Sequence, residues 1–188
     1  MWFDRFIGTF HHRKIEDTLI GFKKFYDKYN DRINMSYTLI GKGKKRDDEK
    51  IVIILDEYHM HQIVNIKKPV PFKDLTGYLD THNIGVSYIP ITNFYDIQPP
   101  TKTYDYLFSG LVVIGTDTKE NRKIICKENG VLIDDNYDAF FKGLEELFIN
   151  RCFYDINKIR LNFENYSWCN IVNDILKPLI KRIYNLTI

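Results

Sequence analysis

The sequence has few cysteines and no long hydrophobic run, and these absences exclude several classes of protein. Its three cysteines, Cys126, Cys152 and Cys169, are odd in number, far apart and never in a CxxC pair. We therefore expect buried or incidental thiols in a reducing compartment, without disulfides. No apolar run reaches the length of a membrane span, and the start, MWFDRFIGTFHHRK, carries charge too early for a signal peptide. A cytoplasmic protein is expected.

Excess charge is also scarce. The 188 residues carry a net charge of only +2, which does not by itself indicate nucleic acid as a partner. The basic cluster at 42–46 is followed at once by three acidic residues, so we expect a solvated loop there. Hydrophobic residues make up 44% of the chain, and its length suits one domain with a sizeable core.

Several familiar active-site motifs are missing. There is no G-x-x-x-x-G-K-[ST] phosphate loop, no G-x-G-x-x-G and no G-x-S-x-G nucleophile elbow. The D-x-D pattern of many metal-dependent nucleotide-sugar enzymes does not occur either. His11, His12, His59 and His61 lack neighbouring cysteines or carboxylates at metal-binding spacing, so no metal site is expected.

Apolar periodicity predicts strands that alternate with helices. The predicted strands cover 2–10, 35–40, 62–66, 84–89, 111–115 and 131–133. The predicted helices cover 15–29, 50–57, 72–81, 102–109, 119–127, 137–148, 155–165 and 168–185. A strand is the alternative for 50–57, and Pro178 is expected to kink the last helix. The alternation predicts an α/β fold: a single Rossmann-like domain with a parallel sheet of about six strands, helices on both faces and a helical C-terminal tail.

The stretch 92–117 predicts a loop, a short helix and a buried strand. Pro99 and Pro100 end the loop, because proline has no backbone N–H and restricts the residue before it. Thr101 is expected to cap the helix and Gly110 to end it. The first turn of this helix lies at the end of a predicted strand. Open α/β sheets bind ligands there, and a helix N-terminus favours phosphate.

The residues around this helix start form a set suited to a phosphorylated ligand. Lys102 and the backbone amides of 101–103 suit a diphosphate. Asp105, one turn on, suits two ribose hydroxyls, because one carboxylate accepts several hydrogen bonds. Gly8, at the expected end of the first strand, and Lys14 in the next loop extend the set. The alternative is that Lys102 and Asp105 form an exposed i,i+3 pair.

Five motifs, in order along almost the whole chain, resemble the C-terminal, donor-binding domain of GT-B glycosyltransferases of the family 4 type. FIGTFHHRK is similar to the opening strand, glycine and lysine of that domain, and YTLIGKG to its second strand. PPTKTYDYLFSGLVVIGTD resembles its Pro-Ser-Lys-x-x-Glu-Tyr-x-x-x-Gly-x-Pro-Val segment. ENGVLIDD resembles its Asn-Gly-x-Leu-Val stretch, and NYSW the aromatic-Ser-Trp before the last helix.

The resemblance implies a role for each matching residue. Lys14 would contact the donor diphosphate, Asp105 would hold the ribose hydroxyls, and the loop 93–98 would face the transferred sugar. The base would lie near Ile66 and Lys67, and no catalytic residue is implied. The implied donor-binding residues are Gly8, Thr9, Lys14, Ile66, Gln98, Thr101, Lys102, Thr103 and Asp105.

The resemblance also implies an activity and partners. A hexosyl group would pass from a UDP- or GDP-linked donor to a glycan or lipid-linked acceptor in polysaccharide biosynthesis. No metal and no cofactor beyond the donor would be needed. The acceptor-binding N-terminal domain is missing from these 188 residues, so it would act in cis or in trans. Through that domain the protein could contact the inner face of a membrane. Nucleic acid is not an expected partner.

Four positions depart from the family pattern. Thr9 stands where the family has arginine, Asp105 where it has glutamate, Ile97 where a second acidic residue is common, and Val112 where proline is usual. Arg13 is the predicted substitute for the missing cation.

Two other functions remain open. Thr9 and Ile97 favour a non-catalytic Rossmann-like module for binding or interaction. A flavodoxin- or receiver-like domain also fits the strand count, but it needs an acidic pocket at the end of the first strand, and Asp4 precedes that end.

Overall fold

Six parallel strands form the centre of the molecule. The computed structural model describes residues 4–10, 14–43 and 45–184, without the side chains of Thr9, Phe10 and Arg46. The strands are β1 (Arg5–Phe10), β2 (Ser36–Gly41), β3 (Val64–Lys67), β4 (Ile84–Ser87), β5 (Val112–Thr116) and β6 (Gly130–Ile133). Their order in the sheet is β3-β2-β1-β4-β5-β6, which reverses direction between β1 and β4. This order confirms the predicted Rossmann-like sheet.

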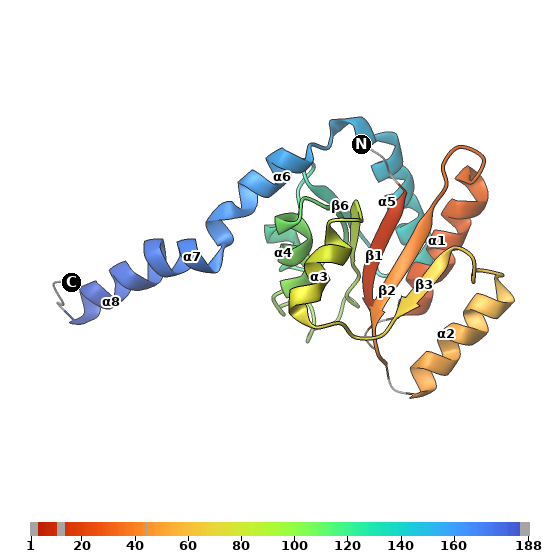
Figure 1. Ribbon diagram of the computed structural model, residues 1–188, viewed down its shortest axis with the longest axis horizontal. Helices are drawn as coiled ribbons and strands as arrows, with labels where there is room; N and C mark the ends of the chain where they lie inside the picture. Colours follow the sequence, from red (N-terminus) through yellow and green to blue (C-terminus); the bar gives the residue numbers. More distant parts are fainter. Residues whose placement is uncertain (1–3, 11–13, 44, 185–188) are drawn as a thin grey trace.

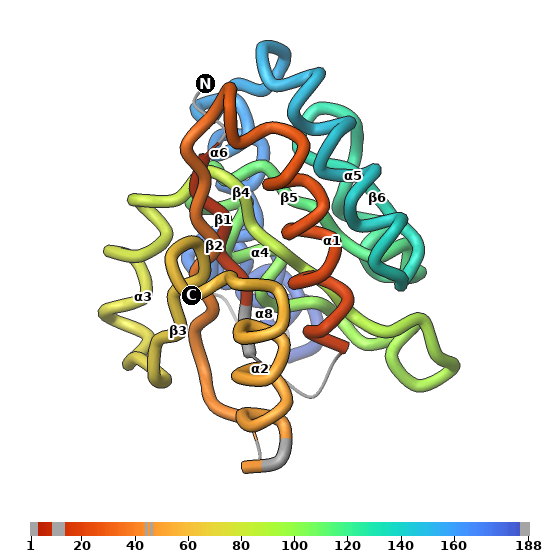
Figure 2. The backbone as a smooth tube through the Cα atoms, turned by 90° about the vertical axis from the view of Figure 1, so that its right-hand side faces the viewer, coloured from red at the N-terminus to blue at the C-terminus, as the bar shows by residue number. Residues whose placement is uncertain are grey.

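Helices cover both faces of this sheet. They are α1 (Ile15–Tyr29), α2 (Lys45–Glu57), α3 (Phe72–Leu79), α4 (Thr101–Phe108), α5 (Tyr137–Ile149) and α6 (Ile156–Phe163), with 3₁₀ turns η1 (Asn121–Lys123), η2 (Arg151–Phe153) and η3 (Glu164–Tyr166). Helices α1 and α5 pack together on one face, and α3 lies on the other (Figure 2). Helix α4 packs against β4, β5 and α6. A helical tail of α7 (Trp168–Asn170), the π-helix η4 (Ile171–Leu176) and α8 (Lys177–Tyr184) leaves the body (Figure 1).

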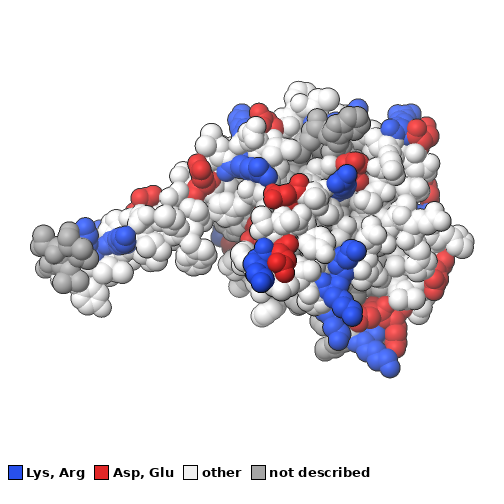
Figure 3. All heavy atoms as spheres, viewed as in Figure 1, with Lys and Arg blue, Asp and Glu red and all other residues white. Residues whose placement is uncertain are grey.

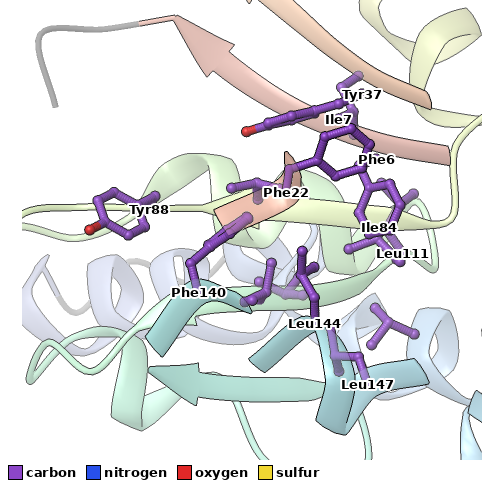
Figure 4. Packing of buried hydrophobic residues seen from close by; sticks show 14 of the residues in the cluster. Phe6, Ile7, Phe22, Tyr37, Ile84, Tyr88, Leu111, Phe140, Leu144 and Leu147 are labelled. Carbon is purple, nitrogen blue, oxygen red and sulfur yellow. The ribbon is translucent and has the colours of Figure 1, made fainter. Parts of the chain in front are cut away.

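The core between the sheet and α1 is rich in aromatic side chains. Phe6 of β1 meets Phe22 of α1 edge to face, with ring centroids 5.2 Å apart, and Tyr37 of β2 lies 5.4 Å from Phe22 (Figure 4). All three are buried. Strands β4 and β5 are buried along their whole length, as expected of central parallel strands with helices on both sides. This packing fixes where β1 and β4 end, and the candidate site lies there.

Some predicted boundaries were wrong, each for a local reason. Helix α2 begins at Lys45, so the charged residues from Lys45 to Glu49 are helical and the strand alternative for 50–57 is excluded. The carboxylate of Asp48 accepts the backbone N–H of Gly43 at 3.1 Å and lies in the first turn, where negative charge is favourable. The segment 119–127 contains only the 3₁₀ turn η1. Gly8 does not end β1, which continues to Phe10.

Three further expectations concern caps, thiols and the last helix. Thr101 is the first residue of α4 and not its cap, whereas Gly110, with φ of 80°, ends that helix as predicted. All three cysteines are free and exposed, so of the two expected alternatives, buried or incidental thiols, burial is excluded. Pro178 lies just after the π-helix η4, so the backbone irregularity is on its N-terminal side. No described helix is long and apolar enough to cross a membrane.

Candidate functional site

A cavity of about 550 Å³ opens at the carboxyl ends of β1 and β2, beside the β4–α4 loop. Its walls come from the ends of β1 and β2, the segment after β3, the loop after β4, and the first turns of α4. Because the sheet reverses its strand order between β1 and β4, the loops that follow these strands diverge there and leave a crevice. The position is the one that open α/β sheets use for ligands.

Five residues predicted from the sequence line this cavity. They are Gly8, Gln98, Thr101, Lys102 and Asp105. They come from three separate segments: the end of β1, the loop before α4, and the first two turns of α4. The structure therefore brings them together, while their individual roles in binding remain predictions.

Three other predicted residues, Ile66, Lys14 and Thr103, do not line the cavity. Ile66 of β3 is 45% exposed, and the cavity wall is instead made by Pro69 and Val70, just after that strand. Lys14 precedes α1, and its Nζ lies 3.0 Å from Oδ2 of Asp135. Thr103 lies inside α4 and is buried. Thr9 pairs with β2 in the sheet, its side chain lies outside the described residues, and Arg13 lies outside them entirely.

Thr103 belongs to a buried polar network that fixes α4 on the sheet. Its Oγ1 lies 2.7 Å from Oγ of Ser87 in β4 and donates to Oδ1 of Asn121 at 3.1 Å. Asn121 in turn donates to the backbone carbonyl of Thr116 in β5. These four residues are fully buried. The sequence analysis missed this network, whose signal was small polar residues inside apolar segments.

The backbone amides at the start of α4 are partly used within the chain. The N–H of Thr101 donates to the carbonyl of Pro99 at 3.2 Å, and that of Thr103 to the carbonyl of Pro100 at 2.9 Å. Pro100 precedes the helix without a side-chain cap. An anion at this helix start would therefore depend on the helix dipole and on nearby lysines more than on these two amides.

Lys102 and Asp105 differ in their surroundings. Lys102 is half-buried, and its Nζ donates to the backbone carbonyl of Tyr88, just after β4, at 3.3 Å. Within the described part of the chain, the carboxylate of Asp105 accepts no hydrogen bond and forms no ion pair. It is half-buried, and this burial raises its pKa above the ordinary value. The exposed i,i+3 pair proposed as an alternative does not form.

Lys14 is held by a partner on another loop. The hydrogen bond to Asp135 raises the pKa of Lys14, and the same carboxylate accepts the backbone N–H of Ile91 at 3.0 Å. Lys14 itself has φ of 49° at the start of α1. This arrangement ties α1, β6 and the β4–α4 loop together beside the cavity. A diphosphate would have to share Lys14 with Asp135.

Gly8 lines the cavity and packs against the buried Tyr37. A Cβ atom at this position would lie 2.6 Å from Oη of Tyr37, so any side chain would collide with a buried ring. Tyr37 is fixed because its hydroxyl donates to Oγ1 of Thr18 at 3.3 Å. Only glycine therefore fits between the buried Tyr37 and the cavity at this position of β1. Gly8 lies at the cavity as expected, but the reason for a glycine there is packing and not the predicted turn.

The sequence analysis missed Lys42 on the cavity rim. Gly41 has φ of 140°, a backbone conformation that favours glycine, and Lys42 follows at the end of β2. Lys42 is exposed and lines the cavity together with Lys102. The Gly-Lys-Gly run after the second predicted strand was the available signal.

The cavity thus combines three kinds of surface. Lys42, Lys102 and the α4 N-terminus favour an anion, Asp105 offers an acceptor for hydroxyl groups, and Ile40 and Val70 give an apolar wall. A ligand with a charged end, a diol and a flat, weakly polar ring would match all three. Among the described residues, no three His, Cys, Asp or Glu side chains are grouped so as to hold a metal ion.

Comparisons with known proteins identify the fold. The sequence matches no family model and no curated protein. The structure of the pneumococcal O-GlcNAc transferase GtfA in complex with UDP and GlcNAc is similar, with a TM-score of 0.75 and 14% identity over 96% of this chain and 36% of that one. The C-terminal domain of LpcC, a group 1 glycosyl transferase from Francisella tularensis, gives a TM-score of 0.67 and 16% identity over 87% of this chain and 86% of that domain.

The same half-fold occurs outside the transferases. A putative UDP-N-acetylglucosamine 2-epimerase from Listeria monocytogenes gives a TM-score of 0.64 and 16% identity over 99% of this chain and 47% of that one. This chain spans between about a third and a half of the length of these longer proteins. The fold is that of one Rossmann-like half of a GT-B protein.

Proposed function

We propose that this chain, which has the fold of the C-terminal half of a GT-B glycosyltransferase, binds a nucleoside diphosphate sugar with a UDP- or GDP-type nucleotide. The observation that carries the proposal is the cavity in which Lys102, the α4 N-terminus and the carboxylate of Asp105 converge. The UDP bound in the GtfA structure supports the choice of ligand class.

One turn of α4 serves two parts of the ligand. Lys102 and Asp105 are three residues apart, so they share one helix face with Cβ atoms about 5–6 Å apart. Lys102 and Lys42 attract the diphosphate, and the carboxylate of Asp105 accepts the two ribose hydroxyls. The base lies against Val70 and Ile40, which replaces the predicted position near Ile66.

The proposed reaction is transfer of a hexosyl group to a glycan or lipid-linked acceptor in polysaccharide biosynthesis. The leaving diphosphate gains negative charge, which Lys102 and the α4 N-terminus stabilise without a metal ion. The acceptor site belongs to a second domain, in cis or in trans, which closes over the open side of the cavity. Peripheral membrane contact of the transferase would come through that domain.

A non-catalytic binding module is the second candidate. It is favoured by the ion pair that occupies Lys14 and by Thr9, which leaves the end of β1 without the family's arginine. The epimerase structure shows that this half-fold also occurs in a protein named for another reaction. Both candidates bind the donor. They differ in whether a second domain supplies an acceptor site.

The test is calorimetric titration of the full chain with UDP, GDP, ADP and uridine. UDP or GDP should bind, and uridine should bind more weakly because it lacks the diphosphate. Lys102→Gln should lower the affinity for the diphosphate by about 10–100-fold, the value of a hydrogen bond to a charged group. Uridine binding should not change.

The matched control is Lys119→Gln. Lys119 is 66% exposed, pairs with Asp96 and does not line the cavity, so its loss should leave UDP affinity unchanged. The absence of binding by every nucleoside diphosphate at millimolar concentration would refute the proposal. Equal binding of UDP and uridine would refute only the diphosphate part of the site.

A further inference from the structure

Charged side chains on this protein often pair with one another. Figure 3 shows several Lys and Arg side chains directly beside Asp or Glu side chains on the body of the molecule. Some pairs join two exposed side chains, such as Lys24 of α1 with Asp138 of α5. The pair of Lys14 with Asp135 is different, because the same carboxylate also binds the loop that follows β4. This pair therefore couples a cation to a segment beside the cavity.

One carboxylate oxygen of Asp135 accepts two hydrogen bonds of different kinds. Nζ of Lys14 donates to Oδ2 at 3.0 Å, and the backbone N–H of Ile91 donates to the same atom at 3.0 Å. Nζ of Lys14 also donates to the backbone carbonyl of Asp135 at 3.3 Å. An ammonium group together with a backbone N–H is a combination that binds phosphate oxygens. Oδ2 of Asp135 thus occupies a place that suits one oxygen of a phosphate.

Two lysines lie at the two ends of one short segment of the β4–α4 loop. Lys102 lines the cavity and donates to the carbonyl of Tyr88, whereas Lys14 is held beside Ile91 through the shared carboxylate. Three residue steps separate Tyr88 from Ile91, so their Cα atoms are at most about 10 Å apart. Ile89, between them, lines the cavity. A diphosphate bound along this segment would therefore lie between two cations.

Of the two partners in the ion pair, Lys14 is the one that can move. Asp135 lies between Ile133, the last residue of β6, and Asn136, whose side chain caps α5. Its carboxylate is also held by the N–H of Ile91. The side chain of Lys14 is 48% exposed, that of Asp135 is 25% exposed, and lysine has a flexible four-carbon stem. A ligand phosphate would thus draw Lys14 away from a carboxylate that stays in place.

We propose that Asp135 is an internal competitor of the ligand diphosphate. In the empty protein its carboxylate holds Lys14, and a diphosphate gains this cation only by breaking the ion pair. Asp135 therefore limits the affinity for UDP and sets how much nucleotide is needed to fill the cavity. This role of Asp135 rests on the proposed function, because it regulates the same cavity.

The test is calorimetric titration of the full chain and of Asp135→Asn with UDP and with uridine. Asparagine keeps an oxygen that accepts the N–H of Ile91, so the loop should stay in place while the negative charge is lost. Asp135→Asn should bind UDP about fivefold more tightly, the upper value of an exposed ion pair. Uridine has no phosphate, so its affinity should not change.

A thermodynamic cycle with Lys14→Gln tests whether the effect of Asp135 acts through this lysine. In the wild type, Lys14→Gln should weaken UDP binding only about twofold, because the gain from Lys14 is offset by the broken ion pair. In the Asp135→Asn variant the same change should weaken it about tenfold, the value of a hydrogen bond to a charged group. The two changes should therefore be coupled by about fivefold, and equal effects in both backgrounds would overturn the proposal.

The matched control is Asp138→Asn. It removes the same charge and breaks the pair with Lys24, 2.6 Å long, three residues beyond Asp135. UDP affinity should stay unchanged, and a gain equal to that of Asp135→Asn would mean a general effect of charge and would overturn the proposal.

The same titrations separate this proposal from the proposed function. If UDP binds the wild type and Asp135→Asn equally well, the competition is refuted and the proposed function stands. If no nucleoside diphosphate binds either protein, the proposed function fails and the role of Asp135 fails with it.

Discussion

Replacing Asp105 by asparagine should have opposite effects on stability and on ligand binding. The carboxylate is half-buried on α4, and within the described residues it has no hydrogen-bond or ion-pair partner. Its charge is therefore unfavourable in the empty protein and useful only when hydroxyl groups occupy the cavity. We expect Asp105→Asn to stabilise the unliganded protein and to weaken UDP binding.

The magnitudes follow from the degree of burial. A fully buried, unsatisfied polar group costs about 1–3 kcal/mol. Asp105 is only half-buried, so the gain in the free energy of unfolding should be about 1 kcal/mol at pH 7. Hydrogen bonds to a charged group contribute about 1.5–3 kcal/mol each, so the UDP dissociation constant should rise at least about tenfold.

The pH dependence gives the sign of the effect, with Asp96→Asn as the matched control. Burial raises the folded-state pKa of Asp105, so its destabilising effect is present at pH 7, shrinks as pH falls through the raised pKa, and is gone below the ordinary value of 3.8. Asp96 accepts the backbone N–H of Lys119 and pairs with its Nζ, which lowers the pKa of Asp96. Its stabilising effect is present above 3.8 and is lost as pH falls through the lowered pKa.

Urea unfolding of both variants between pH 4.5 and 7.5, with UDP calorimetry at pH 7, measures all three quantities. Asp105→Asn should be more stable than the wild type by a margin that narrows toward acid pH, and Asp96→Asn should be less stable by a margin that stays constant over this range, because the lowered pKa of Asp96 lies below it. If Asp105→Asn were less stable at pH 7, the carboxylate would have a favourable partner and the reasoning would fail. Unchanged UDP affinity would remove only the ribose assignment.

Three smaller predictions concern stability, each measured by urea unfolding at pH 7. Gly85→Ala places a Cβ atom 2.4 Å from Cγ of the buried Tyr106 and should cost about 1–3 kcal/mol, and no loss would mean that the ring can move aside. Gly77→Ala in α3 meets nothing within 4 Å and should instead gain about 0.5–1 kcal/mol; a loss there would contradict the open surroundings. Asn136→Ala removes the side chain that accepts the N–H of Ala139 at 2.8 Å, and should cost about 1 kcal/mol unless water replaces the cap.

Periodicity gave the central elements of the fold but not every boundary. Helix α1 covers the predicted 15–29, because apolar residues at helical spacing face a single sheet surface. The start of α2 was missed, because its first turn is charged and has no apolar period to read. There the carboxylate of Asp48 and the helix dipole decide the boundary, and these are local interactions without a repeat.

The cavity was predicted best where one continuous segment builds it. Lys102 and Asp105 share a helix turn, so their spacing in the sequence is also their spacing in space. Ile66 does not line the cavity, and Pro69 and Val70 do, because the path from β3 to the cavity depends on how the chain turns at Pro69. The partner of Lys14, Asp135, is 121 residues away, and no sequence pattern connects the two.

The π-helix Ile171–Leu176 sets the angular phase of the tail. Apolar pairs recur every four residues along the tail, at 171/172, 175/176, 179/180 and 183/184. An α-helix has about 3.6 residues per turn, so this four-residue repeat advances about 40° beyond each turn and would wind slowly around the tail. A π-helix closes its hydrogen bonds one residue later and has more residues per turn, so the same repeat falls behind in it. The two drifts oppose one another across η4 and α8, and the apolar pairs stay in closer alignment than in a uniform α-helix. Deleting one residue from η4 would rotate everything beyond it by somewhat less than the about 100° that one residue spans in an α-helix, whereas substitutions that keep the chain length would leave this alignment intact.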